Sequence, residues 1–328
     1  MNEIRLGTIG SGVIVRSILD AVARTEGIAL EAVYSRSAEK GEKLAAAYGA
    51  KKVYTDLDAL FADEAVNFVY VASPNSLHYE QAKRALLAGK NVLCEKPFCA
   101  AGEQVRELAA LAEARGLYLI DATPTAFLPN FEAVREQLPR IGRLRLVQCS
   151  YCQYSSRYDQ VLAGETPNIF NPAFAGGCLQ DINYYNVYFN VALFGRPEEA
   201  VYYPNVCPTG ADSSGIMVLR YPGFVCECTG AKDTWGVNAV QIQGEKGYLY
   251  IENGANGVAA VRVVTRDGEV QINRQPDPDR WYYEIQGLTR LVLDGDRDAF
   301  RRRLAVTADV VDVIERSRKR AGIRFAGE

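Results

Sequence analysis

The first 122 residues of the chain alternate short apolar runs with segments in which apolar residues recur every three or four positions. Uninterrupted apolar runs are typical of strands in a parallel sheet that is covered on both faces, and the periodic segments between them predict helices. The expected strands are residues 4–9, 29–34, 68–72, 91–94 and 118–121, and the expected helices are residues 12–24, 37–48, 76–88 and 103–115. This alternation predicts an α/β fold with a doubly wound parallel sheet, the Rossmann arrangement.

After Pro124 the pattern changes to longer strands, which are separated by turn sequences such as PG, EKG and RDG. Such spacing predicts hairpins, and therefore an α+β domain with a large, mostly antiparallel, open sheet. The expected strands are residues 143–154, 213–221, 225–231, 238–243, 247–252 and 258–265, and the expected helices are residues 129–138, 179–194, 280–293 and 298–321. We expect two domains, residues 1–122 and 123–328, which agrees with the length of the chain.

The composition argues against several classes of partner. A formal net charge of −3, without a lysine- or arginine-rich block, argues against nucleic acid or an anionic membrane surface. The amino terminus lacks the pattern of a secretion signal, and no apolar run reaches the length of about 18 residues that a membrane span needs. Eight cysteines in a chain of this length do not indicate a disulfide framework. These features favour the reducing cytoplasm.

His78 is the only histidine in the sequence. This count argues against a metal site built from histidines, and a serine–histidine–aspartate triad would have to use His78. Cys149 and Cys152 form a CxxC pair, but they lie in a β-rich stretch, where side chains three residues apart point to opposite faces. We therefore expect buried thiols and no bound metal.

Gly10 and Gly12 follow the first expected strand and precede the first expected helix. Gly10 would allow a tight turn, and Gly12 would let the backbone approach a pyrophosphate. The N–H groups that open the helix, from Val13 onward, would then face that anion. The third glycine of the GxGxxG pattern is absent, since Val15 occupies its position. The position between strand and helix nevertheless favours a dinucleotide site.

The second strand ends in Ser35, Arg36 and Ser37, without the acidic residue that usually binds the ribose 2′-hydroxyl of NAD. Ser35, Arg36 and nearby Lys40 suit a 2′-phosphate instead, so NADP is the preferred cofactor and NAD the alternative. The other interpretation is that Arg36 stacks on the adenine of NAD while Ser37 only caps the following helix.

Residues 69–98 contain the loop ASPN at 72–75, His78, the turn AGK at 88–90 and the triplet EKP at 95–97. At this spacing the segment resembles the Gfo/Idh/MocA oxidoreductases, the family of glucose–fructose oxidoreductase, inositol dehydrogenase and dihydrodiol dehydrogenase. The resemblance covers nearly the whole chain, since residues 176–195 look like the family's second-domain helix and residues 240–254 like its sheet hairpin.

The resemblance implies that six residues of this segment contact the cofactor. The residues concerned are Ser73, Pro74, Asn75, His78, Glu95 and Lys96. Asn75 and His78 would line the nicotinamide ribose, and the Lys96–Pro97 peptide bond would be cis. The Lys96 ammonium could stabilise the alkoxide that develops during hydride transfer. Taken alone, Lys96 is also consistent with a surface lysine before a turn proline, and His78 with a satisfied, partly buried histidine.

Asp181 and Tyr185 lie four residues apart on an expected helix, so they share one face. Many family members carry a histidine at the second position as the acid–base. The resemblance implies that Tyr185 takes this role, that Lys96 lowers its pKa, and that Asp181 orients the substrate or the tyrosine. The alternative is that Asp181 caps the helix and Tyr185 packs in the core.

Four positions depart from the family's pattern. Asn183 and Tyr184 replace small residues, which leaves the shape of the pocket open. In the segment 121–129, Pro124 replaces an aromatic residue and Ala126 an arginine, so contacts made by those two side chains do not carry over to this chain.

The resemblance implies hydride transfer between NADP(H) or NAD(H) and a secondary alcohol or carbonyl of a sugar, cyclitol or related polyol. Two alternatives stay open: an NAD-assisted glycosidase of the same fold, and a non-catalytic regulator that senses a dinucleotide. Both alternating sets of side chains in residues 213–221 are largely apolar, which predicts helices on one face of the second sheet and another subunit on its other face. The resemblance likewise implies a homodimer or homotetramer.

Overall fold

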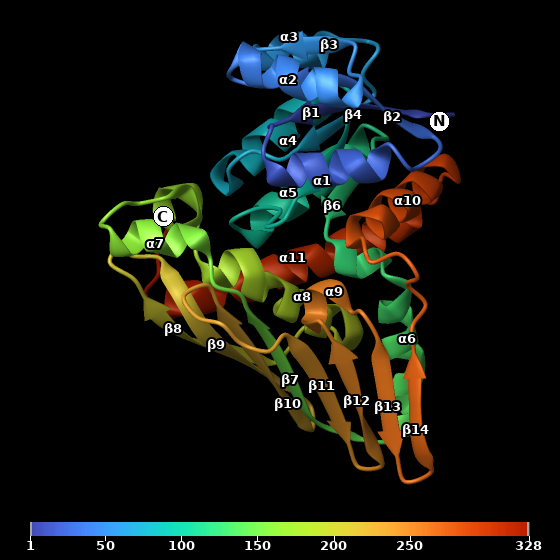
Figure 1. The fold of residues 1–328 in the computed structure, drawn as a ribbon, viewed down its shortest axis with the longest axis vertical. Coiled ribbons are helices and arrows are strands. Elements are labelled where there is room, and N and C mark those ends of the chain that lie inside the picture. Colours follow the sequence, from blue (N-terminus) through green and yellow to red (C-terminus); the bar gives the residue numbers. More distant parts are fainter. Residues whose placement is uncertain (1, 327) are drawn as a thin grey trace. The chain divides into compact units, whose positions relative to one another are not determined.

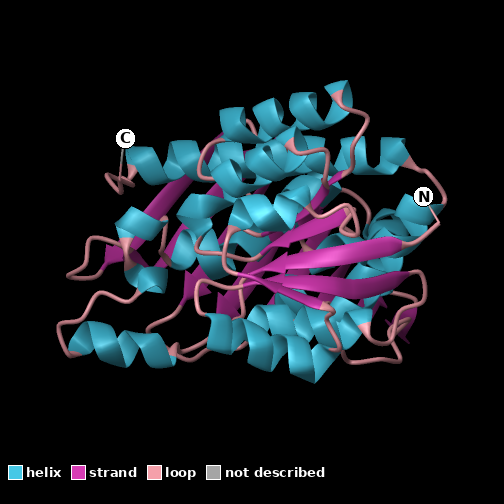
Figure 2. Cartoon of the chain, turned by 90° about the horizontal axis from the view of Figure 1, so that it is seen from above, coloured by secondary structure: helices cyan, strands magenta, loops and turns pink. Residues whose placement is uncertain are grey.

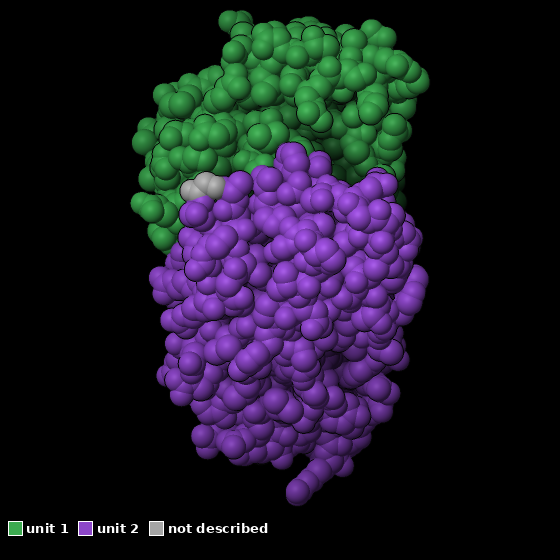
Figure 3. Space-filling view, turned by 90° about the vertical axis from the view of Figure 1, so that its left-hand side faces the viewer, with its two compact units in different colours: residues 1–127, 281–308 green, residues 128–280, 309–328 purple. Residues whose placement is uncertain are grey.

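The structure is a computed structural model that describes residues 2–326 and 328 (Figure 1). Its contacts divide the chain into two compact units, residues 1–127 with 281–308, and residues 128–280 with 309–328 (Figure 3). The expected domains, 1–122 and 123–328, are continuous segments of the chain. Residues 1 and 327 of these ranges lie outside the residues that the structure describes. The return of residues 281–308 to the first unit is a feature that the pattern along the chain does not reveal.

The first unit is built on a parallel sheet of six strands in the order β3-β2-β1-β4-β5-β6. This is the order of a doubly wound sheet, so the predicted Rossmann fold is confirmed. The strands are β1 (Ile4–Ile9), β2 (Ile28–Tyr34), β3 (Lys52–Tyr54), β4 (Phe68–Val71), β5 (Asn91–Glu95) and β6 (Leu119–Ala122). The sequence pattern missed β3 and the short helix α3 (Leu57–Ala62) that follows it.

Helices cover both faces of this sheet (Figure 2). They are α1 (Val13–Val22), α2 (Ala38–Tyr48), α4 (His78–Leu87), α5 (Gly102–Ala114) and α10 (Arg280–Leu293). On one face Phe68 and Tyr70 share a core with residues of α1, α2 and α10. Val69 and Val71 are also fully buried, on the other face, where α4 and α5 pack against β4, β5 and β6. This two-sided burial explains the uninterrupted apolar runs.

The second unit is built on a sheet of eight strands in the order β14-β13-β12-β11-β7-β10-β9-β8. Neighbouring strands are antiparallel except β7 and β10, so the predicted mostly antiparallel sheet is confirmed. The strands are β7 (Leu144–Cys152), β8 (Glu199–Val206), β9 (Asp212–Tyr221), β10 (Phe224–Ala231), β11 (Ala239–Gly244), β12 (Gly247–Glu252), β13 (Val261–Thr265) and β14 (Gly268–Ile272). The pattern missed β8 and β14, the two edges of the sheet.

One face of the second sheet is covered by helices. Met217 and Leu219 of β9 are fully buried, whereas Ile216, which points to the other face, is 41% exposed. The helices of this unit are α6 (Pro129–Gln137), α7 (Ser156–Leu162), α8 (Tyr184–Phe194), α9 (Gly254–Gly257) and the second half of α11 (Arg297–Arg320). The chain enters α8 through a π-helical turn, η6 (Leu179–Asn183). Such turns are rare in proteins overall, but those that occur are often at functional sites.

Within residues 2–326 and 328, the helices lack the combination of length and hydropathy that a membrane span requires.

Candidate active site

A cavity of about 500 Å³ opens in the first unit at the carboxyl ends of β1, β2 and β4. In the sheet, β1 lies between β2 and β4, so the strand order reverses here, and this is where doubly wound sheets bind ligands. The cavity is lined by Ile9, Gly10, Ser11, Tyr34, Ser35, Arg36, Ser37, Lys40, Ala72, Ser73, Pro74, Leu77 and Gln81. Five of the residues that the sequence assigns to the cofactor therefore line one cavity: Gly10, Ser35, Arg36, Ser73 and Pro74.

The glycine turn after β1 has the geometry of a phosphate-binding loop. Gly10 has φ +118°, and a Cβ there would lie 2.6 Å from the carbonyl oxygen of Ala72, so this position requires glycine. Gly12 is the N-cap of α1 and supplies no side-chain cap, while a Cβ at Gly12 would meet only open space. Val13, which opens the helix, is 83% exposed. The backbone N–H groups at this helix start can therefore donate hydrogen bonds to an anionic group from outside the chain.

The end of β2 brings positive charge to the same cavity. Ser37 caps α2, since its Oγ accepts a hydrogen bond from the Lys40 backbone N–H at 3.4 Å, as the second interpretation of this motif expects. The Oγ of Ser35 accepts from the Ser37 N–H at 3.3 Å. Arg36 is exposed and lines the cavity with Lys40, and the described lining residues include no carboxylate. These residues fit a dinucleotide that carries an additional phosphate.

His78 connects the two loops that the sequence assigns to the cofactor. Its ring is buried, with Nδ1 2.9 Å from the carbonyl oxygen of Pro97 and Nε2 2.8 Å from that of Ser73. Burial lowers the pKa of His78 and thus favours the neutral ring, which donates only one hydrogen bond. Both ring nitrogens face backbone, so a contact of His78 with the nicotinamide ribose stays a prediction.

The triplet at 95–97 lies at the carboxyl end of β5. The Lys96–Pro97 peptide bond is cis, as the resemblance implies. Lys96 is half-buried, and Asn75 begins the short 3₁₀ turn η1 (Asn75–Leu77) after β4. Glu95 is buried, and its carboxylate accepts hydrogen bonds from the Tyr70 hydroxyl at 2.6 Å and from the Lys96 N–H at 3.2 Å. Its carboxyl group therefore serves the loop itself, and a contact with cofactor stays a prediction.

Glu95 predicts a pH dependence of stability. Burial raises the pKa of its carboxyl to about 7, whereas the pKa in an unfolded chain is about 4.3. Between these values the folded chain binds more protons than the unfolded one, so the free energy of unfolding falls as the pH rises through this window. Glu95→Gln should abolish this fall in the free energy of unfolding, which amounts to about 3 kcal/mol between about pH 5 and about pH 8. Urea unfolding of the parent chain and the variant at about pH 5 and about pH 8 checks this prediction. If their free energies of unfolding differ by the same amount at both pH values, the prediction is wrong.

In the second unit, the expected catalytic pair lies where η6 meets α8. Asp181 belongs to the π-helical turn and is half-buried, while Tyr185 of α8 is buried. The Tyr185 ring lies 6.0 Å from the Tyr151 ring, and the Arg280 guanidinium lies 5.5 Å from its centroid. The Asp181 carboxylate forms an ion pair with Lys232. Two cations thus lie beside the expected acid–base residues.

Lys232 and Arg280 were not expected from the sequence. Lys232 follows β10 and Arg280 begins α10, so each is far along the chain from the residue that it contacts. A strand-terminal lysine is a weak signal in a single sequence, because such positions more often face solvent. The two unusual positions near the pair have structural roles: Asn183 donates to the Cys228 carbonyl at 2.9 Å, and Tyr184 is fully buried.

The segment in which Ala126 replaces the family's arginine receives a guanidinium from another element. Arg303 of α11 donates to the Ala126 carbonyl at 2.6 Å and lies 4.0 Å from the centroid of the Phe127 ring. All three residues belong to the first unit. Pro124, the second departure, is buried.

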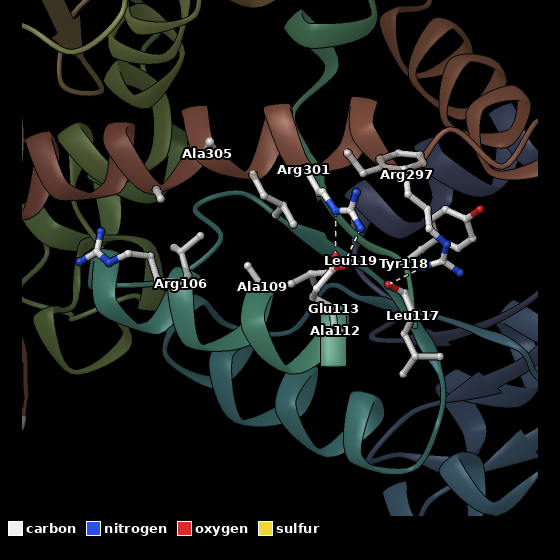
Figure 4. A pocket seen from close by; sticks show the side chains of 14 residues that line it. Arg106, Ala109, Ala112, Glu113, Leu117, Tyr118, Leu119, Arg297, Arg301 and Ala305 are labelled. Atoms are coloured by element: carbon white, nitrogen blue, oxygen red, sulfur yellow. Dashed lines mark hydrogen bonds and ion pairs between the residues drawn. The ribbon is translucent and has the colours of Figure 1, made fainter. Parts of the chain in front are cut away.

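A second cavity in the first unit, of about 340 Å³, lies between α5 and the first half of α11 (Figure 4). Its wall includes residues 117–119, which lead into β6, so it lies at the amino end of that strand, away from the edge where α/β sheets bind ligands. Arg301 pairs with Glu113, and Arg297 donates to the Gly116 carbonyl at 2.7 Å. These two interactions hold α11 to α5 and to the turn that follows α5.

The fold and the cavity at the switch point define the class of this chain as an α/β protein with a dinucleotide-binding Rossmann unit. Residues 4–122 match the model of the oxidoreductase family with an NAD-binding Rossmann fold, and residues 132–250 match the GFO/IDH/MocA C-terminal domain. The scyllo-inositol 2-dehydrogenase (NADP(+)) of Bacillus subtilis (strain 168) is 36% identical over 330 residues, 99% of each chain.

Two further proteins are similar over most of their length. The D-xylose 1-dehydrogenase (NADP(+)) of Hypocrea jecorina is 28% identical over 95% of this chain and 87% of its own. The crystal structure of a 3-ketoreductase from Actinomadura kijaniata, in complex with NADP and TDP-benzene, has a TM-score of 0.84 and 24% identity, over 97% of this chain and 98% of its own. The chain belongs to the Gfo/Idh/MocA oxidoreductase family.

Proposed function

We propose that the protein is an NADP(H)-dependent dehydrogenase or reductase acting on a secondary alcohol or carbonyl of a sugar, cyclitol or related polyol. The observation that carries this proposal is the cavity at the switch point, where Arg36 and Lys40 offer two positive charges and the described lining residues include no carboxylate. NADP suits such a site better than NAD, whose ribose hydroxyls usually bind an acidic residue. The Bacillus and Hypocrea relatives, named for NADP(+) with scyllo-inositol and with D-xylose, support the same cofactor and substrate class.

In this proposal the nicotinamide would give a hydride to a carbonyl or take one from an alcohol, and the residues of the chain bind the cofactor and move a proton. The turn from Gly10 to Val13 would hold the pyrophosphate through backbone N–H groups, and Ser35 and Arg36 would hold the 2′-phosphate. Lys96 would hydrogen-bond the substrate oxygen, and Tyr185 would give a proton to it or take one from it. Asp181 would orient the substrate or the tyrosine.

A panel of inositols, aldoses and the matching keto compounds, assayed with NADP(H) and with NAD(H), tests the proposal. We expect net cofactor turnover with at least one member, and a larger kcat/KM with NADP(H). An NAD-assisted glycosidase would release sugar without net cofactor turnover, and a dinucleotide sensor would turn over no member. Either result contradicts the proposal.

The cytoplasm is the proposed location. The eight cysteines are all buried and free, which agrees with a reducing compartment. Four of them, Cys149, Cys152, Cys226 and Cys228, lie on the neighbouring strands β7 and β10.

We propose that the open face of the second sheet binds another copy of the chain. On this face Ile216 is 41% exposed, Val225 is 37% exposed and Tyr203 is 65% exposed, which is unusual for a face that meets only water. We expect light scattering at micromolar concentration to report a particle larger than the 36.1 kDa chain. Ile216→Arg, which places a charge on this face, should shift the population toward monomer. A 36.1 kDa parent particle contradicts the proposal.

A further inference from the structure

A buried ammonium group lies at the carboxyl end of β10. The side chain of Lys232 is 3% exposed. Its backbone is fixed on both sides, since its N–H donates to the Ser213 carbonyl at 2.8 Å and its carbonyl accepts from the Ser155 N–H at 2.9 Å. These bonds tie the residue to two neighbouring segments of the second unit. The start of the Lys232 side chain is therefore set by the sheet and not by a flexible loop.

The ammonium of Lys232 pairs with Oδ2 of Asp181, and it also lies 5.3 Å from the centroid of the Phe170 ring. The two partners differ in exposure, because 28% of the Asp181 side chain is accessible compared with 3% for Lys232. Asp181 is therefore the partner that a bound molecule can reach, whereas Lys232 is shielded from solvent.

Two other carboxylates lie near this pair, and each has its own donors. Oδ2 of Asp212 accepts from the Tyr202 hydroxyl and from the Leu179 N–H, both at 2.6 Å. Oδ2 of Asp233 accepts from the hydroxyls of Ser213 and Ser214 at 2.7 and 2.9 Å. These donors are neutral, whereas the ion pair of Asp181 is with the Lys232 ammonium.

The bond from Leu179 to Asp212 adds a second constraint on the catalytic segment. Leu179 begins the π-helical turn that carries Asp181, so Asp212 fixes the start of this turn while Lys232 fixes the carboxylate on it. Without the ammonium, the Asp181 carboxylate would lose an ion pair that helps to hold its direction.

We propose that Lys232 is a positioning residue of the active site: it holds the Asp181 carboxylate in one orientation, without touching the substrate. This inference rests on the proposed function, in which Asp181 orients the substrate or Tyr185. It names a residue that acts through Asp181, and it predicts that the effect of Lys232 on turnover disappears when Asp181 no longer carries a charge.

The test compares Lys232→Met, Lys232→Arg, Asp181→Asn and the double variant Lys232→Met with Asp181→Asn. Turnover is measured with NADP(+) and the best polyol of the panel, and NADPH affinity by calorimetric titration. We expect Lys232→Met to lower kcat about 10- to 100-fold, because small displacements of an orienting group have effects of this size. NADPH affinity should stay within about twofold, because Lys232 does not belong to the lining of the NADPH cavity. Lys232→Arg should recover most of the loss.

The double variant separates positioning from a merely structural role. In the Asp181→Asn background, Lys232→Met should cause no further loss of kcat, since residues that act as a unit are not additive. Lys90→Met is the matched control: Lys90 is also a buried lysine, but its ammonium donates to the backbone carbonyls of Asp63 and Val66. It should lower the melting temperature and leave kcat unchanged. If Lys232→Met does not fold, Lys232→Gln, which keeps a donor but no charge, takes its place.

Normal turnover of Lys232→Met, or a double variant whose loss equals the product of the two single losses, overturns the inference while the proposed function stands. An equal loss in Lys232→Arg and Lys232→Met overturns it as well. Absence of turnover in the parent chain refutes the proposed function, and the inference with it.

Discussion

Replacing Tyr185 with phenylalanine should lower kcat by about 10²- to 10⁴-fold while NADPH still binds, because this is the usual loss when a general acid or base is removed. Hydride transfer to a carbonyl leaves an alkoxide that must be protonated, and the hydroxyl of Tyr185 is the proposed donor. The sole histidine of the sequence cannot easily replace it, since both ring nitrogens of His78 face backbone carbonyls. Steady-state kinetics with the best polyol or ketone of the panel measure the loss.

Lys96→Ala should lower kcat by a similar factor, because the ammonium would stabilise the same developing charge. The double variant should fall far short of the product of the two losses, since groups that act together are not additive. Tyr188→Phe is the matched control: Tyr188 is a buried tyrosine on the same helix α8, and it should keep near-normal turnover. If Tyr185→Phe turns over normally, Tyr185 is a packing residue, and Lys96 or a water held by Asp181 is the acid.

Arg36→Ala should weaken NADPH binding about 10- to 100-fold and affect NADH less. A hydrogen bond to a charged group contributes about 1.5–3 kcal/mol, and a 2′-phosphate offers such a group whereas a 2′-hydroxyl does not. Arg36 is exposed and lines the cavity, so its removal costs little stability and the effect on affinity can be measured in isolation. Calorimetric titration of both cofactors gives the two affinities.

The control for Arg36 is Arg84→Ala. Arg84 is an exposed arginine of the same unit that pairs with Asp58 and does not belong to the lining of the cavity. It should change neither affinity. Equal affinities of the parent chain for NADPH and NADH would show that Arg36 does not select a phosphate, and the stacking interpretation would then hold.

The sequence predicts the central strands of both sheets and misses three strands at their edges. β3 ends the first sheet, and β8 and β14 end the second. An edge strand has a neighbour on one side only, and β14 shows the result, since four of its five residues are exposed. A strand that buries little surface does not need an apolar pattern, so periodicity cannot detect it.

The parts of the candidate site that a local backbone motif forms were predictable from the sequence. The parts that depend on a side chain distant in the sequence were not. The turn at Gly10 needs glycine for local steric reasons, so it is visible in the sequence. Lys232 and its partner Asp181 are 51 residues apart, and neither segment has a sequence pattern that predicts contact with the other. The π-helical turn that carries Asp181 likewise follows from tertiary contacts such as the bond from Leu179 to Asp212.

The return of residues 281–308 to the first unit sets the order in which a nascent chain can complete its structure. Ile285, Leu288 and Val292 of α10 are buried in the same core as strands β1, β2 and β4. When the ribosome has made residues 1–127, all six strands of the first sheet exist, but the apolar face that α10 covers is still open. Residues 128–280 must all be synthesised before α10 emerges. Many amino-terminal domains finish folding before the rest of the chain is made, but this unit cannot. A chaperone can therefore bind its open face during the whole synthesis of residues 128–280.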